Sequence, residues 1–238
     1  MAKPLLLDLF CGAGGAGQGY YLAGFEVIGC DIEPQPHNPH TFYQDDALYV
    51  LGTLITGGCW NGYTLKQFDV IHESPVCKGY TNCNLSPHEK YEKLIAPTRR
   101  LLQKSGKPYV IENVMGAKRY MNASLMLCGT MFNLPMQRHR LFEFGNTDAW
   151  IRPPKPCNHK SATIGVYGHS IWDSSQVGTP RKDGKKRPDS VPLTVGRQAM
   201  EIDWMGIEEL AQAIPPAYTQ WIGTQLLACI NSSVGGVV

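Results

Sequence analysis

The sequence has no apolar run that approaches the ~18–20 residues needed to cross a bilayer. Its first residues meet an acid at Asp8, so they lack the apolar core of a secretory signal peptide. It also has no internal repeat and no long low-complexity tract. We therefore expect an intracellular protein with no membrane partner.

An excess of charge of one sign is also missing. The chain has 22 Lys+Arg and 20 Asp+Glu, a formal charge of +2 that excludes a uniformly basic nucleic-acid coat protein. At 43% hydrophobic and 18% charged residues, it is neither disordered nor a coiled coil. The 8 cysteines are expected to be mostly reduced thiols inside a cell. The 238 residues suit one large domain, with room for a small appendage.

Short apolar runs alternate with helix-like segments along the first 145 residues. The expected strands are Pro4–Phe10, Phe25–Asp31, Phe68–His72, Tyr109–Val114 and Leu141–Phe144. Helices are expected over Pro87–Lys104, 197–212 and 216–230. Strands that alternate with helices predict an α/β fold with a doubly wound, mostly parallel sheet covered by helices on both faces.

A glycine-rich turn follows the first expected strand and opens a helix. Gly12, Gly14 and Gly15 would let a ligand approach the backbone, and a helix N-terminus favours electronegative groups. Asp31 ends the next expected strand, where an acid is placed to accept the two hydroxyls of a ribose. Taken alone, these features indicate a nucleotide-type site no more strongly than an ordinary tight turn.

The string Asp8-Leu9-Phe10-Cys11-Gly12-Ala13-Gly14-Gly15 is more specific. It resembles the opening motif of the cytosine-C5 methyltransferases, which bind S-adenosylmethionine. Five further motifs of that family occur in the family's order: Asp45-Asp46-Ala47, Ser74-Pro75-Val76-Cys77, Glu112-Asn113-Val114, Arg138-His139-Arg140, and Ala213-Ile214-Pro215-Pro216 through Ile222-Gly223. The resemblance covers residues 4–144 and 193–228, and it is strongest to the short enzymes carried by phages and prophages.

The resemblance implies a Rossmann-like fold that binds S-adenosylmethionine. The cofactor-binding residues that it implies are Asp8, Phe10, Gly12, Gly14, Gly15, Asp31, Ile32, Asp46 and Pro75. Asp46, rather than Asp45, would face the adenine amino group. A monomer in the cytoplasm of a bacterium or a phage-infected cell is the expected setting.

The resemblance also implies a covalent mechanism on cytosine. The Cys77 thiolate would add to C6 so that C5 can attack the methyl group. Glu112 would hold the N3 and amino edge and, if burial raises its pKa, protonate N3. Arg138 or Arg140 would polarise O2 and help to keep the thiol ionised. The sequence does not identify the base that removes the C5 proton.

Two residues beside the nucleophile depart from the family pattern. Val76 stands where the family usually has Pro, and Lys78 stands where it usually has Gln. Lys78 could lower the pKa of Cys77 or contact a DNA phosphate. These departures leave a non-catalytic DNA-binding relative open. No metal site is expected, because Cys157-Asn158-His159 has too few neighbouring ligands in the sequence.

Positive charge gathers where the family carries its target-recognition domain. Residues 138–187 hold ten basic and four acidic residues, a local charge of +6. Lys182, Lys185, Lys186 and Arg187 are expected to contact phosphates, while Trp150, Tyr167 and Trp172 could stack on bases. We expect a catalytic domain of residues 1–145 and 193–238 and a basic insert of residues 146–192. Double-stranded DNA is the expected partner, and the small insert leaves RNA or a free nucleotide open.

Overall fold

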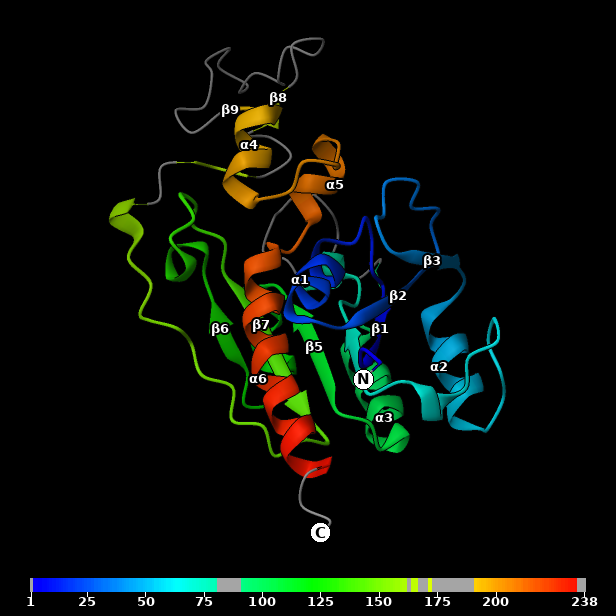
Figure 1. Cartoon of the computed structure of the whole chain (residues 1–238). Coiled ribbons are helices and arrows are strands. Elements are labelled where there is room, and N and C mark those ends of the chain that lie inside the picture. The colour runs from blue at the N-terminus through cyan, green and yellow to red at the C-terminus, as the bar shows by residue number, and fades with distance from the viewer. Residues whose placement is uncertain (1, 81–90, 162–163, 167–170, 173–190, 235–238) are drawn as a thin grey trace.

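A computed structural model describes residues 2–80, 91–161, 164–166, 171–172 and 191–234 (Figure 1). Its main sheet has seven strands in the order β3-β2-β1-β4-β5-β7-β6. The strands are β1 (Leu5–Leu9), β2 (Glu26–Asp31), β3 (Thr41–Gln44), β4 (Val70–Glu73), β5 (Tyr109–Asn113), β6 (Leu125–Leu127) and β7 (Arg140–Gly145). The helices are α1 (Gly15–Ala23), α2 (Ala47–Ile55), α3 (Ile95–Ser105), α4 (Leu193–Met200), α5 (Ile207–Gln212) and α6 (Pro216–Val234).

The strand pairing confirms the predicted doubly wound, mostly parallel sheet. Strands β3, β2, β1, β4 and β5 pair in parallel, whereas β7 runs antiparallel to both β5 and β6. The chain leaves β1 toward β2 on one side and returns to β4 on the other. Ligands of open α/β sheets bind at the carboxyl ends of the strands near such a reversal, so this edge is the place to look for a site.

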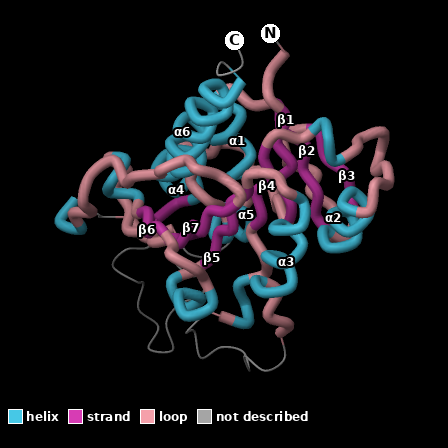
Figure 2. Tube along the Cα trace, turned by 90° about the horizontal axis from the view of Figure 1, so that it is seen from below, coloured by secondary structure: helices cyan, strands magenta, loops and turns pink. Residues whose placement is uncertain are grey.

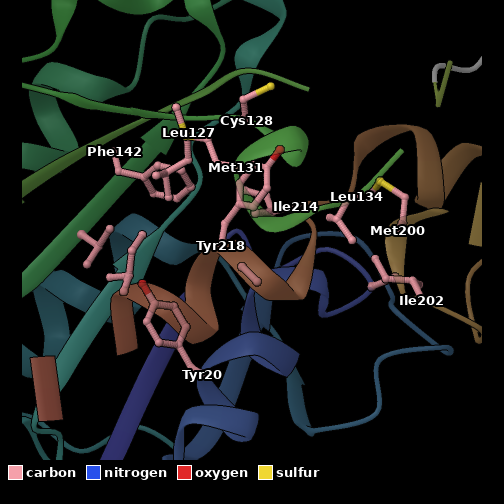
Figure 3. Packing of buried hydrophobic residues seen from close by; sticks show 14 of the residues in the cluster. Tyr20, Leu127, Cys128, Met131, Leu134, Phe142, Met200, Ile202, Ile214 and Tyr218 are labelled. Carbon is pink, nitrogen blue, oxygen red and sulfur yellow. The ribbon is translucent and has the colours of Figure 1, made fainter. Parts of the chain in front are cut away.

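Helices cover both faces of the sheet. Figure 2 shows α1 and α6 on one face and α2 and α3 on the other. The first face buries a cluster that includes Tyr20, Phe142 and Tyr218, part of which appears in Figure 3. The second buries a cluster that includes Leu51 and Leu102. The sheet therefore has an apolar layer on each side, as its continuous apolar strands require.

Helices α1 and α6 approach each other very closely. A Cβ atom at Gly19 would lie 2.0 Å from Thr219 Oγ1, so no larger residue fits in α1 at this point. The Thr219 hydroxyl donates a hydrogen bond to the Ala16 carbonyl at 2.7 Å. The last sequence motif, which begins α6, is thereby held against the helix that follows the glycine turn.

Several element boundaries differ from the sequence-based expectation. Helix α3 begins at Ile95 rather than at Pro87, and residues 81–90 lie outside the described part of the chain. The expected helix over 197–212 is two helices, because Glu201 adopts a left-handed conformation with φ of 58° and ends α4. Strand β3 and helix α2 were not expected. Local patterns did not reveal these short elements because packing in the sheet stabilises them.

The basic insert is described only in part. Residues 146–161 follow β7 and run along the β6 side of the sheet (Figure 1). Farther on, β8 (Ile171–Trp172) pairs in parallel with β9 (Val191–Pro192). Lys182, Lys185, Lys186 and Arg187 lie outside the described residues, as does Tyr167. Within the described residues, no helix is both long enough and apolar enough to span a membrane.

Candidate active site

The glycine turn after β1 forms an open cradle at the start of α1. Gly12 and Gly14 have φ angles of 49° and 81°, a region that L side chains rarely adopt. A Cβ atom at Gly12 would meet no atom within 4 Å, so space is available above this backbone. Gly14 is the N-cap of α1 and offers no side chain to the first amides of the helix. This backbone can therefore receive a ligand.

Two acids lie beside this cradle, at the ends of neighbouring elements. Asp31 Oδ2 accepts the Gly12 backbone N–H at 2.9 Å, and Asp31 Oδ1 accepts the Glu33 N–H at 3.0 Å. Asp46 is the N-cap of α2, where its Oδ1 accepts the N–H groups of Leu48 and Tyr49. Both carboxylates are thus oriented by backbone amides before any ligand binds.

The hydrogen-bond partners of Asp45 and Asp46 distinguish the two as candidate ligand-binding acids. Asp45 uses both oxygens within the protein, one for the Trp60 indole at 3.0 Å and one for the Asp46 backbone N–H at 2.8 Å. Asp46 is exposed, and among the described residues its Oδ2 has no hydrogen-bond donor. Ile32 lies nearby in sequence after Asp31 and is 60% exposed, an apolar surface of the kind on which an adenine ring could rest.

Asp8 lies in β1 beneath the cradle and is buried. Burial and the negative charge of Asp31 raise the pKa of Asp8 to about 8, while a backbone interaction with Gly17 opposes this shift. Phe10 follows with a positive φ of 56°, which starts the turn. Asp8 is therefore close enough to Asp31 for the negative charge of Asp31 to raise its pKa. No basic side chain is among the causes of this pKa shift.

The candidate nucleophile lies on the loop after β4. Cys77 is exposed and begins a short 3-10 helix, Cys77–Gly79. The loop before it is held from the neighbouring strand, because the Asn113 side-chain amide donates to the buried Pro75 carbonyl at 2.8 Å. Asn113 belongs to the Glu112-Asn113-Val114 motif, but no local sequence pattern indicates this role. It fixes the loop that presents the thiol.

Glu112 is the penultimate residue of β5 and is buried next to an arginine. Arg140 Nε lies 3.1 Å from Glu112 Oε1, and the two side chains form an ion pair. The pKa of Glu112 is nevertheless raised above its usual range, chiefly by burial, while Arg140, Ser74 and Arg138 act in the opposite direction. The condition set for its role as a proton donor, a pKa raised by burial, is therefore met.

The two candidate arginines have different surroundings. Arg138 is buried, and its terminal nitrogens donate to the Val166 carbonyl at 2.8 Å and the Ala211 carbonyl at 2.7 Å. It thereby joins the basic insert to α5. Arg140 instead directs its Nε to Glu112. Of the two, Arg140 is the one paired with the candidate proton donor.

The charges around Cys77 do not give a low thiol pKa. Desolvation and the negative charge of Glu112 raise the pKa of Cys77, and the positive charges of Arg140 and Arg138 only partly oppose them. Lys78 is exposed and does not contribute to this shift; it lies 5.7 Å from the centre of the Tyr91 ring. The suggestion that Lys78 lowers the thiol pKa is therefore not supported, and phosphate contact stays its predicted role.

A buried chain of polar groups leads from α1 to Glu112. The Tyr20 hydroxyl lies 3.0 Å from His72 Nδ1, and His72 Nε2 lies 3.0 Å from Ser74 Oγ. Ser74 in turn forms a hydrogen bond with Glu112 that favours its charged form. Burial lowers the pKa of His72 to about 3, so the imidazole is neutral near pH 7.

The sequence predicted too few metal ligands near Cys157 and His159, and this premise is wrong. The fold brings Cys128 and His139 next to them. These residues are separated by up to 31 positions in the chain, so no local spacing pattern could reveal the cluster.

Among curated proteins, the chain is similar to the type II methyltransferase M.AgeI of Thalassovita gelatinovora. The two are 26% identical over 188 residues, which are 67% of this chain and 44% of that protein. The chain therefore spans less than half the length of this curated relative. No family model matches the sequence.

Solved structures share the fold over nearly the whole chain. A candidate DNA modification methyltransferase from an E. coli prophage has a TM-score of 0.57 and 14% identity, covering 96% of this chain and all of that one. A Spodoptera frugiperda DNMT2 mutant has a TM-score of 0.56 and 12% identity, covering 94% of this chain and all of that one. S. pombe Dnmt2 has a TM-score of 0.51 and 14% identity, with coverage of 96% and 100%. The fold is thus the Rossmann-like methyltransferase fold, and the resemblance to a short DNA methyltransferase is confirmed.

Proposed function

We propose that the chain is an S-adenosylmethionine-dependent DNA methyltransferase that methylates C5 of cytosine. The observation that carries this proposal is the grouping of the Cys77 thiol, the buried Glu112 carboxyl and Arg140 at the carboxyl ends of β4 and β5. The glycine cradle lies at the end of the adjacent strand β1. A thiol and a proton donor beside a nucleotide-type cradle suit covalent activation of a base followed by methyl transfer.

The residues around the cradle fit S-adenosylmethionine. Asp31 would accept the ribose hydroxyls, Asp46 Oδ2 would accept the adenine amino group, and Ile32 would cover the adenine ring. The open backbone at Gly12 leaves room for the ligand, and the acidic surroundings of Asp8 and Asp31 favour a cation. When bound, this cofactor supplies an electrophilic methyl group on a positively charged sulfur.

The activation of cytosine follows from the residues that face one another. The Cys77 thiolate forms a bond to C6, the C5–C6 π electrons move to the C4–C5 bond, and the C4–N3 π electrons move to N3, which takes the Glu112 proton. The product is a neutral enamine whose C5 is nucleophilic. After C5 is methylated, a water takes the C5 proton, the C5–H electrons re-form the C5–C6 double bond, and the S–C6 bond breaks, which releases the Cys77 thiolate and restores the aromatic ring. Glu112 then recovers the proton from N3.

The proton on Glu112 also affects the nucleophile. The charged form of Glu112 is one of the causes that raise the pKa of Cys77, whereas Arg140 and Arg138 lower it. A protonated Glu112 removes the unfavourable charge and leaves the two arginines to stabilise the thiolate. The raised pKa of Glu112 thus serves both steps, because the acid that protonates N3 is also the form that permits thiolate formation.

The two arginines would have separate duties. Arg140, paired with Glu112, would polarise the cytosine O2 and stabilise the thiolate. Arg138 would act as a positioning residue, since its guanidinium binds backbone carbonyls of residues 166 and 211 and holds the insert beside the catalytic domain. The division into a catalytic domain (1–145 and 193–238) and a target-recognition insert (146–192) is part of this proposal.

The proposed partner is double-stranded DNA, with the target cytosine flipped from the helix. The local charge of +6 over residues 138–187 supports phosphate binding, and Trp150 is 78% exposed. Replacing Lys182, Lys185, Lys186 and Arg187 with Ala should weaken DNA binding and flatten its salt dependence, while donor affinity stays constant. An unchanged salt slope would show that these cations do not contact phosphates.

The decisive experiment offers a labelled methyl donor to duplex DNA, transfer RNA and dCMP. Label should appear at cytosine C5 in DNA, and 5-fluorocytosine DNA should trap a covalent adduct with the wild-type chain. Cys77→Ser should give neither result, whereas the exposed Cys59→Ser should give both. Label in RNA alone would favour the second candidate, an RNA methyltransferase, which the small insert of 146–192 makes plausible. Donor binding without label or trapping would instead favour a non-catalytic relative.

A further inference from the structure

Four metal-binding side chains converge on the β6 side of the sheet, outside the candidate active site. Cys128 directly follows β6, His139 directly precedes β7, and Cys157 and His159 lie on the segment 146–161. One donor atom from each residue lies within 4.8 Å of the other three. The His139 and His159 Nε2 atoms are 3.1 Å apart, Cys128 Sγ is 3.7 Å from His159 Nε2, and Cys157 Sγ is 4.0 Å from His139 Nε2.

These distances resemble the edges of a small tetrahedron. Zinc bonds of ~2.3 Å to sulfur and ~2.0 Å to nitrogen give tetrahedral edges of about 3.3–3.8 Å between donor atoms. The observed separations lie close to this range, and two sulfurs with two nitrogens form a donor set typical of zinc. A hydrogen bond between the two imidazoles would explain only the shortest contact. We propose that Cys128, His139, Cys157 and His159 bind one Zn²⁺ in a structural site.

The surroundings support a built site. Thr130 Oγ1 lies 3.4 Å from Cys128 Sγ and accepts the Asn158 backbone N–H at 3.2 Å, so it joins the two ligand-bearing segments. Such interactions orient the ligands of metal sites. In Figure 3, the Cys128 sulfur lies at the edge of the apolar cluster and points away from Met131 and Tyr218. The Cys128 side chain is fully buried in this cluster, and its sulfur lies 3.7 Å from His159 Nε2.

The site would fasten the start of the basic insert to the catalytic sheet. Two ligands come from the sheet side and two from residues 157–159, so one ion links the two parts of the chain. His139 stands between Arg138 and Arg140, and the bound ion would therefore also fix the backbone that carries both guanidiniums. All four positions of the ion are filled by protein, as in structural zinc sites. This inference does not depend on the proposed methyl transfer.

The test measures metal content and coordination rather than activity. The full chain, purified under reducing conditions, should contain about one zinc ion per chain by mass spectrometry of the metal. After replacement with Co²⁺, the visible spectrum should show the bands of a tetrahedral ion and of sulfur-to-cobalt charge transfer. Cys128→Ser and Cys157→Ser should each weaken Zn²⁺ affinity at least about 10-fold, while the control Cys59→Ser should bind one ion.

A conservative variant separates ligand loss from misfolding. Cys157→His keeps four ligands, so it should retain Co²⁺ with weaker sulfur-to-cobalt charge transfer. A wild-type chain that holds no zinc and gives no tetrahedral Co²⁺ spectrum after full reduction would overturn the proposal. Reduced Cys128→Ser and Cys157→Ser variants that both bind the metal with unchanged affinity would also overturn it. Methylation assays on the same samples report the proposed function separately, because either result can fail without the other.

Discussion

Two neighbouring regions at the carboxyl edge of the sheet surround their acidic side chains with different groups. At the glycine cradle, Asp8 and Asp31 lie near each other, and Asp31 is held by backbone amides. Beside the loop that carries Cys77, the buried Glu112 of β5 forms an ion pair with Arg140. Burial raises the pKa of both buried acids, but only Glu112 has arginines that oppose the shift.

This difference indicates what each region is suited to bind. A cationic ligand beside Asp8 and Asp31 would favour the charged form of Asp8 and lower its pKa, because no basic side chain is among the determinants of that pKa. An acid balanced by an arginine can hold or release a proton with a modest change in local charge. The first region therefore suits a sulfonium donor and the second suits proton transfer to a base. The predictions below separate the two regions.

The largest expected effect is on the nucleophile. Cys77→Ser should reduce methyl transfer at least about 10³-fold, because the hydroxyl cannot replace the thiolate that adds to C6. Donor affinity, measured by calorimetry, should stay within twofold, since the cradle is untouched. A Ser variant with substantial turnover would remove the covalent mechanism.

Glu112→Gln should lower kcat by about 10²–10³-fold through loss of the proton donor. It should also lower the pKa of the Cys77 thiol, because a negative charge that raises this pKa is removed. The pH dependence of iodoacetamide alkylation, corrected with Cys77→Ser, measures the thiol. A thiol pKa that rises would contradict the assigned electrostatics.

Substitutions of Arg140 and Arg138 should change different measured quantities. Arg140→Gln should lower kcat about 10²-fold and raise the thiol pKa. Arg138→Gln should chiefly destabilise the fold, by about 2–4 kcal/mol, because it removes charged hydrogen bonds to one buried and one partly buried carbonyl. Arg100→Gln, an exposed position on α3, is the control for charge. Urea unfolding measures the stability of each variant, and alkylation measures its thiol pKa. A large stability loss in Arg140→Gln and a raised thiol pKa in Arg138→Gln would contradict these roles.

A smaller effect is expected at the cradle. Asp31→Asn should weaken donor binding about 10-fold, because one charged acceptor for the ribose is lost. The Cys77 thiol pKa should not change, since Asp31 is not among its determinants. Glu26→Gln, at the exposed start of the same strand, should leave donor binding intact. Calorimetry measures the donor affinity of both variants. An equal loss of affinity in Asp31→Asn and Glu26→Gln would show that Asp31 is not part of the site.

The smallest expected effect concerns stability and pH. The folded pKa of Asp8 is about 8, above its model-peptide value of 3.8, so its contribution to stability is full below about pH 4 and is lost as pH rises toward 8. On this account the free energy of unfolding should fall by about 2 kcal/mol between pH 6 and pH 8. Asp8→Asn should flatten that slope in urea titrations. An identical slope in the variant would show that Asp8 is charged in the folded chain.

Much of the fold, and the residues that form the candidate site, could be predicted from the sequence. The apolar runs predicted β1, β2, β4, β5 and β7, because fully buried parallel strands need continuous apolar residues. The glycine turn was also predicted, since positive φ angles favour glycine. The ordered motifs predicted that Cys77 and Glu112 serve one site, which stays a prediction, and the charge of Glu112 is close enough to raise the pKa of Cys77.

Other properties depend on atoms that are distant in the chain. Arg138 and Arg140 look alike in the sequence, yet the carbonyls of Val166 and Ala211 bind one and Glu112 pairs with the other. The raised thiol pKa is a balance of burial and charges from β5 and β7. The same is true of the Cys128, His139, Cys157 and His159 cluster, which three separate segments build. The sequence by itself determined the kinds of chemical group and their order, because these follow from local pattern. Only the tertiary structure decided which groups meet, because distance and burial set their interaction energies.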